Sequence, residues 1–127
     1  MAHTLEYKGA LPAGKVQSML AAIDLLILPS RDEPFPMIIL EALAVGTPVL
    51  VMPSCGFADN LSTFEPSFVA ETEDLPGLIS SFRIHSEAKF LKKSQSEIIN
   101  FCRNTFGISP ITDQLEVLYM KAIENAK

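Results

Sequence analysis

The sequence contains few of the residue types that build metal centres or nucleophilic active sites. It has two cysteines, two histidines and no tryptophan among its 127 residues. Cys55 and Cys102 lack the CxxC spacing of a structural zinc site, and no histidine joins either of them in a cluster. No serine stands in a Gly-x-Ser-x-Gly elbow. We therefore expect neither a structural metal nor a serine hydrolase, and we expect His3 and His85 to lie on the surface.

Positive charge and long apolar runs are also scarce. Ten Lys and Arg stand against 15 Asp and Glu, which gives a formal net charge of −5 and argues against a nucleic-acid partner. No apolar run approaches the roughly 20 residues of a membrane span, and no signal peptide is recognisable, so we expect a cytoplasmic protein. Lys89, Lys92 and Lys93 form a small basic cluster, which predicts the solvated side of a helix. A peripheral membrane contact is the alternative for this cluster.

The apolar residues that are present predict an α/β domain. Hydrophobic residues make up 48% of the chain, and the mean hydropathy is positive. Residues 24–29 and 48–52 are typical of buried strands, and the apolar segment between them is typical of a helix. Strand, helix and strand form a βαβ unit, which implies a parallel sheet. Ligands of open parallel sheets bind beyond the carboxyl ends of the strands, where the segment from Ser30 to Phe35 lies.

Two carboxylates accompany this predicted crevice. Glu33 precedes the helix, and Glu41, eight positions later, stands inside it among apolar side chains. The free N–H groups of the first turn favour phosphate, and a carboxylate can accept hydrogen bonds from ribose hydroxyls. In the alternative interpretation, Glu33 is an ordinary acid at a helix start, and Glu41 pairs with a buried arginine or a backbone group.

The segment from residue 23 to residue 61 resembles a known family. It contains Leu28-Pro29-Ser30, Glu33-Pro34-Phe35 and the run Glu41-Ala42-Leu43-Ala44-Val45-Gly46-Thr47-Pro48-Val49. These residue types at these offsets resemble the signature of retaining glycosyltransferases with two Rossmann-like domains, the glycosyl transferases group 1 or GT-B family with the E-x7-E motif. The resemblance covers the C-terminal, donor-nucleotide half of such enzymes. It implies an α/β fold in which helices flank a Rossmann-like parallel sheet, here in partial form.

The resemblance also implies roles for individual residues. Glu41 would hold the ribose hydroxyls of a nucleotide sugar, and Glu33 would be the catalytic residue beside the donor sugar. The backbone of Phe35, Pro36 and Met37 would contact the sugar and the pyrophosphate. The remaining members of the expected binding set are Ser30, Arg31, Gly56 and Asp59.

Two positions depart from the family pattern. Pro36 stands where the family commonly has glycine, and proline supplies no N–H. Because proline suits the first position of a helix, we interpret it as a variant. The loop from Ser54 to Leu61 resembles a Gly-Gly-x-x-Glu loop, with Cys55 in place of the first glycine and Asp59 in place of the glutamate.

Two of the expected site residues have a simpler alternative. Gly56 would serve backbone approach in the family's loop, or it is only a turn after a strand. Arg31, at the mouth of the helix, would lie near phosphate, or it is a solvated loop residue.

The remaining segments predict the rest of a Rossmann-like half. We expect short strands at 5–8 and 68–70 and helices at 14–22, 73–82, 86–106 and 109–127, with Gly107 ending the long helix. The helix at 73–82 is interrupted near Pro76-Gly77 or begins there. Residues 1–127 would then form a single incomplete nucleotide-sugar-binding domain, with 109–127 as its C-terminal helix. The strand at 5–8 lacks its usual neighbour, so either it pairs beside residues 25–28 or an upstream region or a separate chain supplies the missing strands. An unpaired edge there could let two copies dimerise.

The predicted function follows from the resemblance. The chain would be the donor-binding part of a hexosyltransferase that moves sugar from a UDP-, GDP- or ADP-sugar to an acceptor hydroxyl. An N-terminal acceptor domain would be supplied in cis or in trans, and the isolated chain would be inactive. The nucleotide sugar is the donor substrate, and neither a cofactor nor a metal is implied. The alternatives are a non-catalytic fragment or partner subunit of such an enzyme, and a domain like that of nucleotide-sugar epimerases.

Overall fold

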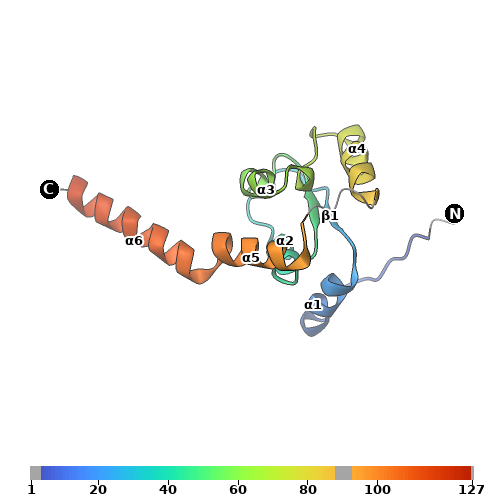
Figure 1. The fold of residues 1–127 in the computed structure, drawn as a ribbon, viewed down its shortest axis with the longest axis horizontal. Coiled ribbons are helices and arrows are strands. Elements are labelled where there is room, and N and C mark those ends of the chain that lie inside the picture. The colour runs from blue at the N-terminus through green and yellow to red at the C-terminus, as the bar shows by residue number, and fades with distance from the viewer. Residues whose placement is uncertain (1–3, 88–92, 127) are drawn as a thin grey trace.

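Helices surround a small parallel sheet. The computed structural model describes residues 4–87 and 93–126. In chain order its elements are α1 (Ala13–Ala22), β1 (Leu26–Leu28), α2 (Met37–Ala44), β2 (Val49–Val51), α3 (Ala58–Phe64), the 3-10 helix η1 (Pro66–Phe68), α4 (Leu75–Ser86), α5 (Gln95–Phe106) and α6 (Ile108–Asn125). β1 and β2 pair in parallel and α2 connects them, which confirms the predicted βαβ unit (Figure 1).

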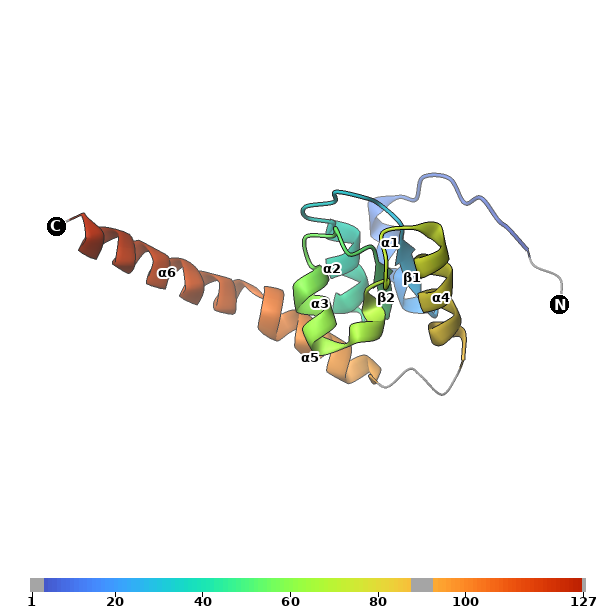
Figure 2. The ribbon, with the colours of Figure 1, turned by 90° about the horizontal axis from the view of Figure 1, so that it is seen from above.

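Alternate residues of the strands point to opposite faces of the sheet. Val49 and Val51 belong to the larger core cluster, whereas Leu50 and Met52 belong to a smaller one. α1, α2, α3 and α5 contribute apolar side chains to the larger cluster, and α4 contributes Leu78 to the smaller one. Figure 2 shows α4 on the opposite side of the strands from α2 and α3. Helices on both faces of a parallel sheet make this a partial, Rossmann-like α/β fold, as predicted.

β1 is less buried than the sequence predicts. All three residues of β2 are buried, but those of β1 are only half-buried. β2 lies between β1 and Val69, which forms an isolated bridge with Val51. In the part of the chain that the structure describes, β1 has β2 as its only strand neighbour. β1 is therefore the edge of the described sheet, and its outer backbone groups are unpaired there.

The strand predicted at residues 5–8 does not form. Residues 4–12 carry neither helix nor strand, and Leu5 and Tyr7 are 99% and 94% exposed. A strand needs a partner for its backbone groups, and within the described residues this segment has none. Figure 1 shows the segment extending away from the sheet. The free sheet edge therefore belongs to β1.

The strand predicted at 68–70 is replaced by a 3-10 turn and a single bridge. Pro66 stands at the start of η1. The Glu65 carboxylate caps this turn by accepting from the backbone N–H of Ser67 at 3.4 Å and from its hydroxyl at 3.0 Å. A proline start and a capping carboxylate favour a helical turn, so only Val69 is left to pair with the sheet.

α4 begins close to Pro76-Gly77, one of the two predicted possibilities, and ends four residues later than predicted. It begins at Leu75 because the Asp74 carboxylate caps it, accepting from the Gly77 N–H at 2.9 Å. His85 lies in its last turn and is buried, which corrects the predicted surface position. Its Nε2 donates to the Ser67 carbonyl oxygen at 2.5 Å. This contact joins α4 to η1 across 18 residues of sequence, so no local sequence pattern could predict it.

Where the sequence predicts one long helix over 86–106, the structure has two helices. α4 ends at the first residue of that range, and α5 begins only at Gln95. A capping box precedes α5, in which Ser94 and Glu97 each accept from the backbone N–H of the other. Residues 88–92 lie outside the described residues. The caps therefore set the boundary that apolar periodicity alone could not show.

The predicted basic cluster is described at one position. Lys89 and Lys92 lie outside the described residues, as His3 does. Lys93 precedes α5 and is half-buried, so it does not stand on the solvated side of a helix. Its Nζ lies 4.8 Å from the centroid of the Phe64 ring, a cation–π contact between the start of α5 and α3.

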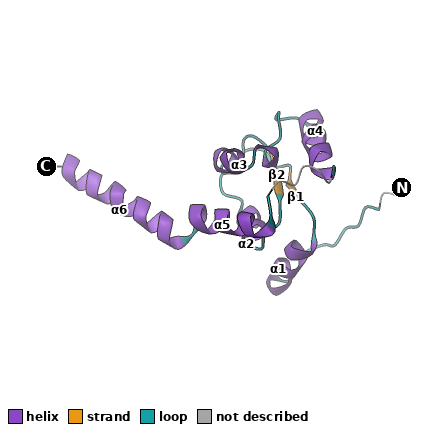
Figure 3. Ribbon diagram, in the orientation of Figure 1, coloured by secondary structure: helices purple, strands orange, loops and turns teal. Residues whose placement is uncertain are grey.

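α6 projects from the rest of the molecule. It begins at Ile108, one residue earlier than predicted, and none of its residues is buried. Gly107 separates it from α5 with a φ of −65°, so it is not in the left-handed region. Figure 3 shows the whole projecting segment as helix. None of the helices in the described ranges is both long and apolar enough to cross a membrane.

Candidate functional site

Three loops meet at the carboxyl end of the sheet. They follow β1, β2 and Val69 and span residues 29–36, 52–57 and 70–74. Because neighbouring parallel strands end at the same edge, the loops that follow them lie side by side. This is the edge at which the sequence predicts a ligand site.

Backbone contacts join the first two loops at Glu33. The Gly56 N–H donates to the Glu33 carbonyl oxygen at 2.9 Å. A Cβ at Gly56 would overlap the Pro34 carbonyl oxygen, so only glycine fits this position. The rings of Phe35 and Phe57 meet edge to face with centroids 4.9 Å apart. The structure therefore brings Glu33, Phe35 and Gly56 together, and the glycine serves a close approach of backbones.

Helix α2 starts at this junction. Pro36 is buried and is the N-cap, one position before the helical position that the sequence predicts for it. No side chain caps α2, and the first helical residue, Met37, is 56% exposed. Among the described residues, the first N–H groups of α2 therefore have no side-chain acceptor at this edge of the sheet, where the helix dipole favours an anion.

Glu41 lies on the second turn of α2. The residue is half-buried, and among the described residues its carboxylate has neither a hydrogen-bond nor an ion-pair partner. Within the same residues no buried side-chain oxygen lacks a partner, so the carboxylate oxygens of Glu41 reach solvent. The alternative of a buried arginine partner thus finds no counterpart in the described part of the chain.

The third loop contributes a carboxylate that sequence reasoning missed. Glu73 accepts two hydrogen bonds from Ser54, one from the backbone N–H at 3.0 Å and one from the hydroxyl at 2.5 Å. The Ser54 Oγ in turn accepts from the Asp32 N–H at 3.2 Å. Asp32 has a φ of 53°, in the left-handed region that aspartate tolerates better than most residues. These partners lie 19 and 22 residues apart, and no spacing in the sequence links them.

Arg31 is the cation of this edge. It is exposed, and its charge helps to lower the pKa of Asp74, after the larger effects of hydrogen bonds from the Thr72 hydroxyl and the Gly77 N–H. It is the only Lys or Arg between residues 16 and 82. Ser30, beside it, is half-buried directly beyond β1. This stretch of sequence therefore offers a single side-chain cation to a phosphate.

Cys55, which stands where the family pattern has a glycine, is buried. Its side chain belongs to the larger core cluster and is 5% exposed. Burial raises the pKa of the Cys55 thiol, an N–H of Phe57 opposes this, and the negative charge of Glu33 raises it further. The thiol therefore stays protonated, and the Glu33 carboxylate lies close enough to act on it.

Asp59 lies apart from the contacts between the loops. It stands in the first turn of α3 and is exposed. It lines a surface cavity of about 370 Å³ with side chains of α3 and α5, among them Phe64 and Phe101. The hydrogen bonds that join the three loops do not involve it. The structure therefore does not connect Asp59 with Glu33.

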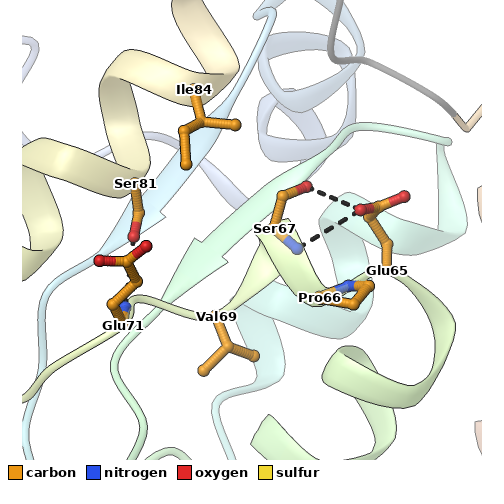
Figure 4. A pocket seen from close by; sticks show the side chains of 7 residues that line it. All are labelled: Glu65, Pro66, Ser67, Val69, Glu71, Ser81 and Ile84. Carbon is orange, nitrogen blue, oxygen red and sulfur yellow. Dashed lines mark hydrogen bonds between the residues drawn. The ribbon is translucent and has the colours of Figure 1, made fainter.

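A second cavity lies between η1 and α4. It measures about 350 Å³ and includes Glu65, Ser67, Glu71 and Ser81 in its lining (Figure 4). Several of its polar groups bond to one another, since Glu65 accepts from Ser67 and the Ser81 hydroxyl accepts from the Glu71 N–H at 3.3 Å. The side chains of Glu65, Ser67 and Ser81 are therefore already paired within the protein. In the described ranges, no three His, Cys, Asp or Glu side chains are grouped so that they could hold a metal ion.

The fold is a partial, Rossmann-like α/β domain in which three loops meet at the carboxyl edge of a parallel sheet, the edge at which such folds bind ligands. The sequence matches the family described as glycosyl transferases group 1 over residues 1–83, which is more than half of the chain. The chain belongs to this family. The resemblance on which the site prediction rests is therefore confirmed at the level of the family.

Two characterised relatives are similar to parts of the chain. A 2-deoxystreptamine N-acetyl-D-glucosaminyltransferase of Streptomyces fradiae is 32% identical over 78 residues, which cover 61% of the chain and 18% of the relative. A UDP-Gal:alpha-D-GlcNAc-diphosphoundecaprenol alpha-1,3-galactosyltransferase of Escherichia coli is 27% identical over 110 residues, which cover 87% and 28%. The chain thus spans less than a third of the length of these relatives. No solved structure matches it.

Proposed function

We propose that the chain is the donor-binding part of a glycosyltransferase that moves a hexosyl group from a nucleotide sugar to an acceptor hydroxyl. The observation that carries the proposal is the junction at Glu33, where Gly56 and the start of α2 meet at the carboxyl edge of the sheet. Membership of the glycosyl transferases group 1 family supports it. Both relatives are named as glycosyltransferases.

The proposed roles follow from the chemistry of each group. Glu41 accepts hydrogen bonds from the ribose hydroxyls, because its carboxylate is accessible and unpaired among the described residues. The first N–H groups of α2 and the guanidinium of Arg31 contact the pyrophosphate. Glu33 lies beside the donor sugar, where its negative charge stabilises the positive charge that develops as the bond to the nucleotide breaks.

The names of the two relatives bear differently on the identities of the donor and the acceptor. The name of the Escherichia coli relative includes UDP-Gal, so UDP is the first nucleotide to test. The two relatives are named for chemically different acceptors, an aminocyclitol and a lipid-linked sugar diphosphate. The acceptor would be bound by a further domain in cis or in trans, because a cleft between two parts must hold both substrates in register.

A titration of the purified chain with UDP, followed by backbone amide shifts, tests the site. We expect shifts at 30–41 and 54–59 and weak binding of about millimolar strength, equivalent to roughly −4 kcal/mol. Inorganic phosphate, added alone, is the control and should move only the amides at the start of α2. Shifts confined to the cavity between η1 and α4 would refute the assignment.

A further inference from the structure

The loop that carries Glu33 depends on a hydrogen-bonded chain that ends at Glu73. This chain runs from the Glu73 carboxylate through Ser54 to the backbone N–H of Asp32, and it joins all three loops at the edge of the sheet. Glu73 and Ser54 are both half-buried, so water competes with the two bonds between them less than it would on an open surface, whereas the bond from the Asp32 N–H is exposed.

The Ser54 hydroxyl connects the two halves of this chain. A serine hydroxyl has one hydrogen to donate and two lone pairs that can accept. Its hydrogen goes to Glu73, because a carboxylate can only accept, and a lone pair is then available to the Asp32 N–H. The Glu73 carboxylate also accepts from the Ser54 N–H, so both the backbone and the side chain of Ser54 are held.

Asp32 is the residue that needs this support. Its φ of 53° places it in the left-handed region, which is unfavourable for a residue with a side chain. Its turn sets the direction in which the chain enters Glu33, whose carbonyl oxygen is then bonded to Gly56. An unsupported left-handed residue would relax and carry Glu33 with it.

Glu73 has no role in starting α4 that would explain it otherwise. Asp74 caps that helix through the Gly77 N–H and also accepts from the Thr72 hydroxyl. Both oxygens of Glu73 are directed to Ser54. The Glu73 side chain therefore bonds to the neighbouring loop and does not cap the helix that follows it.

We propose that Glu73 is a positioning residue of the donor site: it holds Ser54, which fixes the left-handed turn at Asp32 and so places Glu33. That this placement serves a nucleotide-sugar donor rests on the proposed function. The effect of Glu73 on the loop does not, and the two are measured separately.

The test uses backbone ¹⁵N relaxation and amide shifts of the chain without ligand. In Glu73→Ala we expect faster internal motion and shifted amides at residues 31–34, with unchanged hydrogen exchange at core amides such as that of Ala70, which bonds to Val51. Ser54→Ala should have the same effect on Asp32, and Ser54→Thr should restore the wild-type pattern because it keeps a hydroxyl.

Glu71→Ala is the matched control. It removes one negative charge from the same loop, but Glu71 is exposed and, among the described residues, only its backbone N–H forms a hydrogen bond with a side chain. It should leave residues 31–34 unchanged. The proposal would be overturned if internal motion at residues 31–34 increased equally in both variants. It would also be overturned if Glu73→Ala lost protection from hydrogen exchange uniformly over the chain, because that would show a general effect on stability.

UDP binding is the second measurement. We expect Glu73→Ala to weaken it about five- to ten-fold, roughly 1–1.4 kcal/mol at 1.4 kcal/mol per ten-fold, because the loop must be ordered on binding. A loosened loop with unchanged UDP affinity would overturn the positioning role. If UDP fails to bind the wild-type chain, the proposed function fails, and the relaxation data still decide whether Glu73 orders the Glu33 loop.

Discussion

Single residues of the site are constrained in two different ways. Glu41 is placed by its helix, but among the described residues no partner holds its carboxylate, which reaches solvent. Gly56 is constrained by the fold, because a side chain there would overlap Pro34. Substitution of the first should therefore affect binding, and substitution of the second should affect the structure.

Glu41→Gln should weaken UDP binding by about 1.5–3 kcal/mol, the usual value for a hydrogen bond to a charged group. Its melting temperature should stay close to that of the wild type, because no partner is left uncompensated. One thermal melt and one titration measure both. A loss of roughly 3–5 kcal/mol in the free energy of unfolding would instead indicate a buried, paired carboxylate.

Gly56→Ala should lower the free energy of unfolding by about 1–3 kcal/mol, because the new Cβ must push the two loops apart. Denaturant unfolding with an unchanged slope measures this loss. Gly14→Ala is the control, since nothing lies within 4 Å of a Cβ there. That change, in a helix, should leave stability unchanged or raise it by up to about 1 kcal/mol. Equal effects at the two glycines would disprove the close approach.

At the scale of elements, caps decide where helices begin. The sequence periodicity continues through residues 86–106, but the structure divides this range because Ser94 and Glu97 form a capping box before α5. Hydrogen bonds from the backbone N–H and the hydroxyl of Ser94 lower the pKa of Glu97. Hydrogen bonds from Thr72 and Gly77 likewise lower the pKa of Asp74, which caps α4.

The capping box predicts an acid-dependent loss of stability. A carboxyl whose pKa is lowered on folding stabilises the fold above its unfolded pKa of about 4, and this stabilisation is lost as the pH falls through the lowered pKa. Ser94→Ala should cost about 1 kcal/mol at neutral pH and should show a smaller further loss between about pH 5 and pH 2. Unfolding curves across this range measure both effects.

Ser80→Ala, on the exposed side of α4, is the control and should be nearly neutral at every pH. The Ser94 backbone N–H that bonds to Glu97 remains in Ser94→Ala, so Glu97→Gln completes the test. An acid-dependent loss that is equal in wild type and Glu97→Gln would show that the box does not hold Glu97.

At the scale of the whole molecule, the described residues leave a sheet edge and a helix uncovered. β1 presents a free edge, α6 has no buried residue, and the chain spans less than a third of the relatives it matches. Under the proposed function, these residues supply the donor-side loops, and further groups would bind an acceptor and complete the charge around a pyrophosphate.

The purified chain should therefore not transfer sugar. Holding donor and acceptor in register is worth roughly 7–11 kcal/mol of the barrier, and half a cleft cannot supply it. Incubation with UDP-sugars, followed by detection of released UDP, measures this. Robust turnover that Glu41→Gln abolishes would show that the chain carries a complete active site.

The sequence by itself determined the βαβ unit, the family and the loop that carries Glu33. These features follow from local periodicity and from residue types at short offsets, which act within one turn or one strand. The same local patterns could not show that residues 5–8 remain without a partner, because pairing depends on which strand stands beside them.

The tertiary structure alone decided the contacts around the site. Gly56 against Pro34, Glu73 on Ser54 and the buried bond of His85 to Ser67 all join loops or helices that are distant in sequence. Such contacts have no period and no fixed spacing, because they depend on how the sheet brings three strand ends to one edge. The sequence therefore predicted where a site would lie, and the fold determined which contacts hold those loops in place.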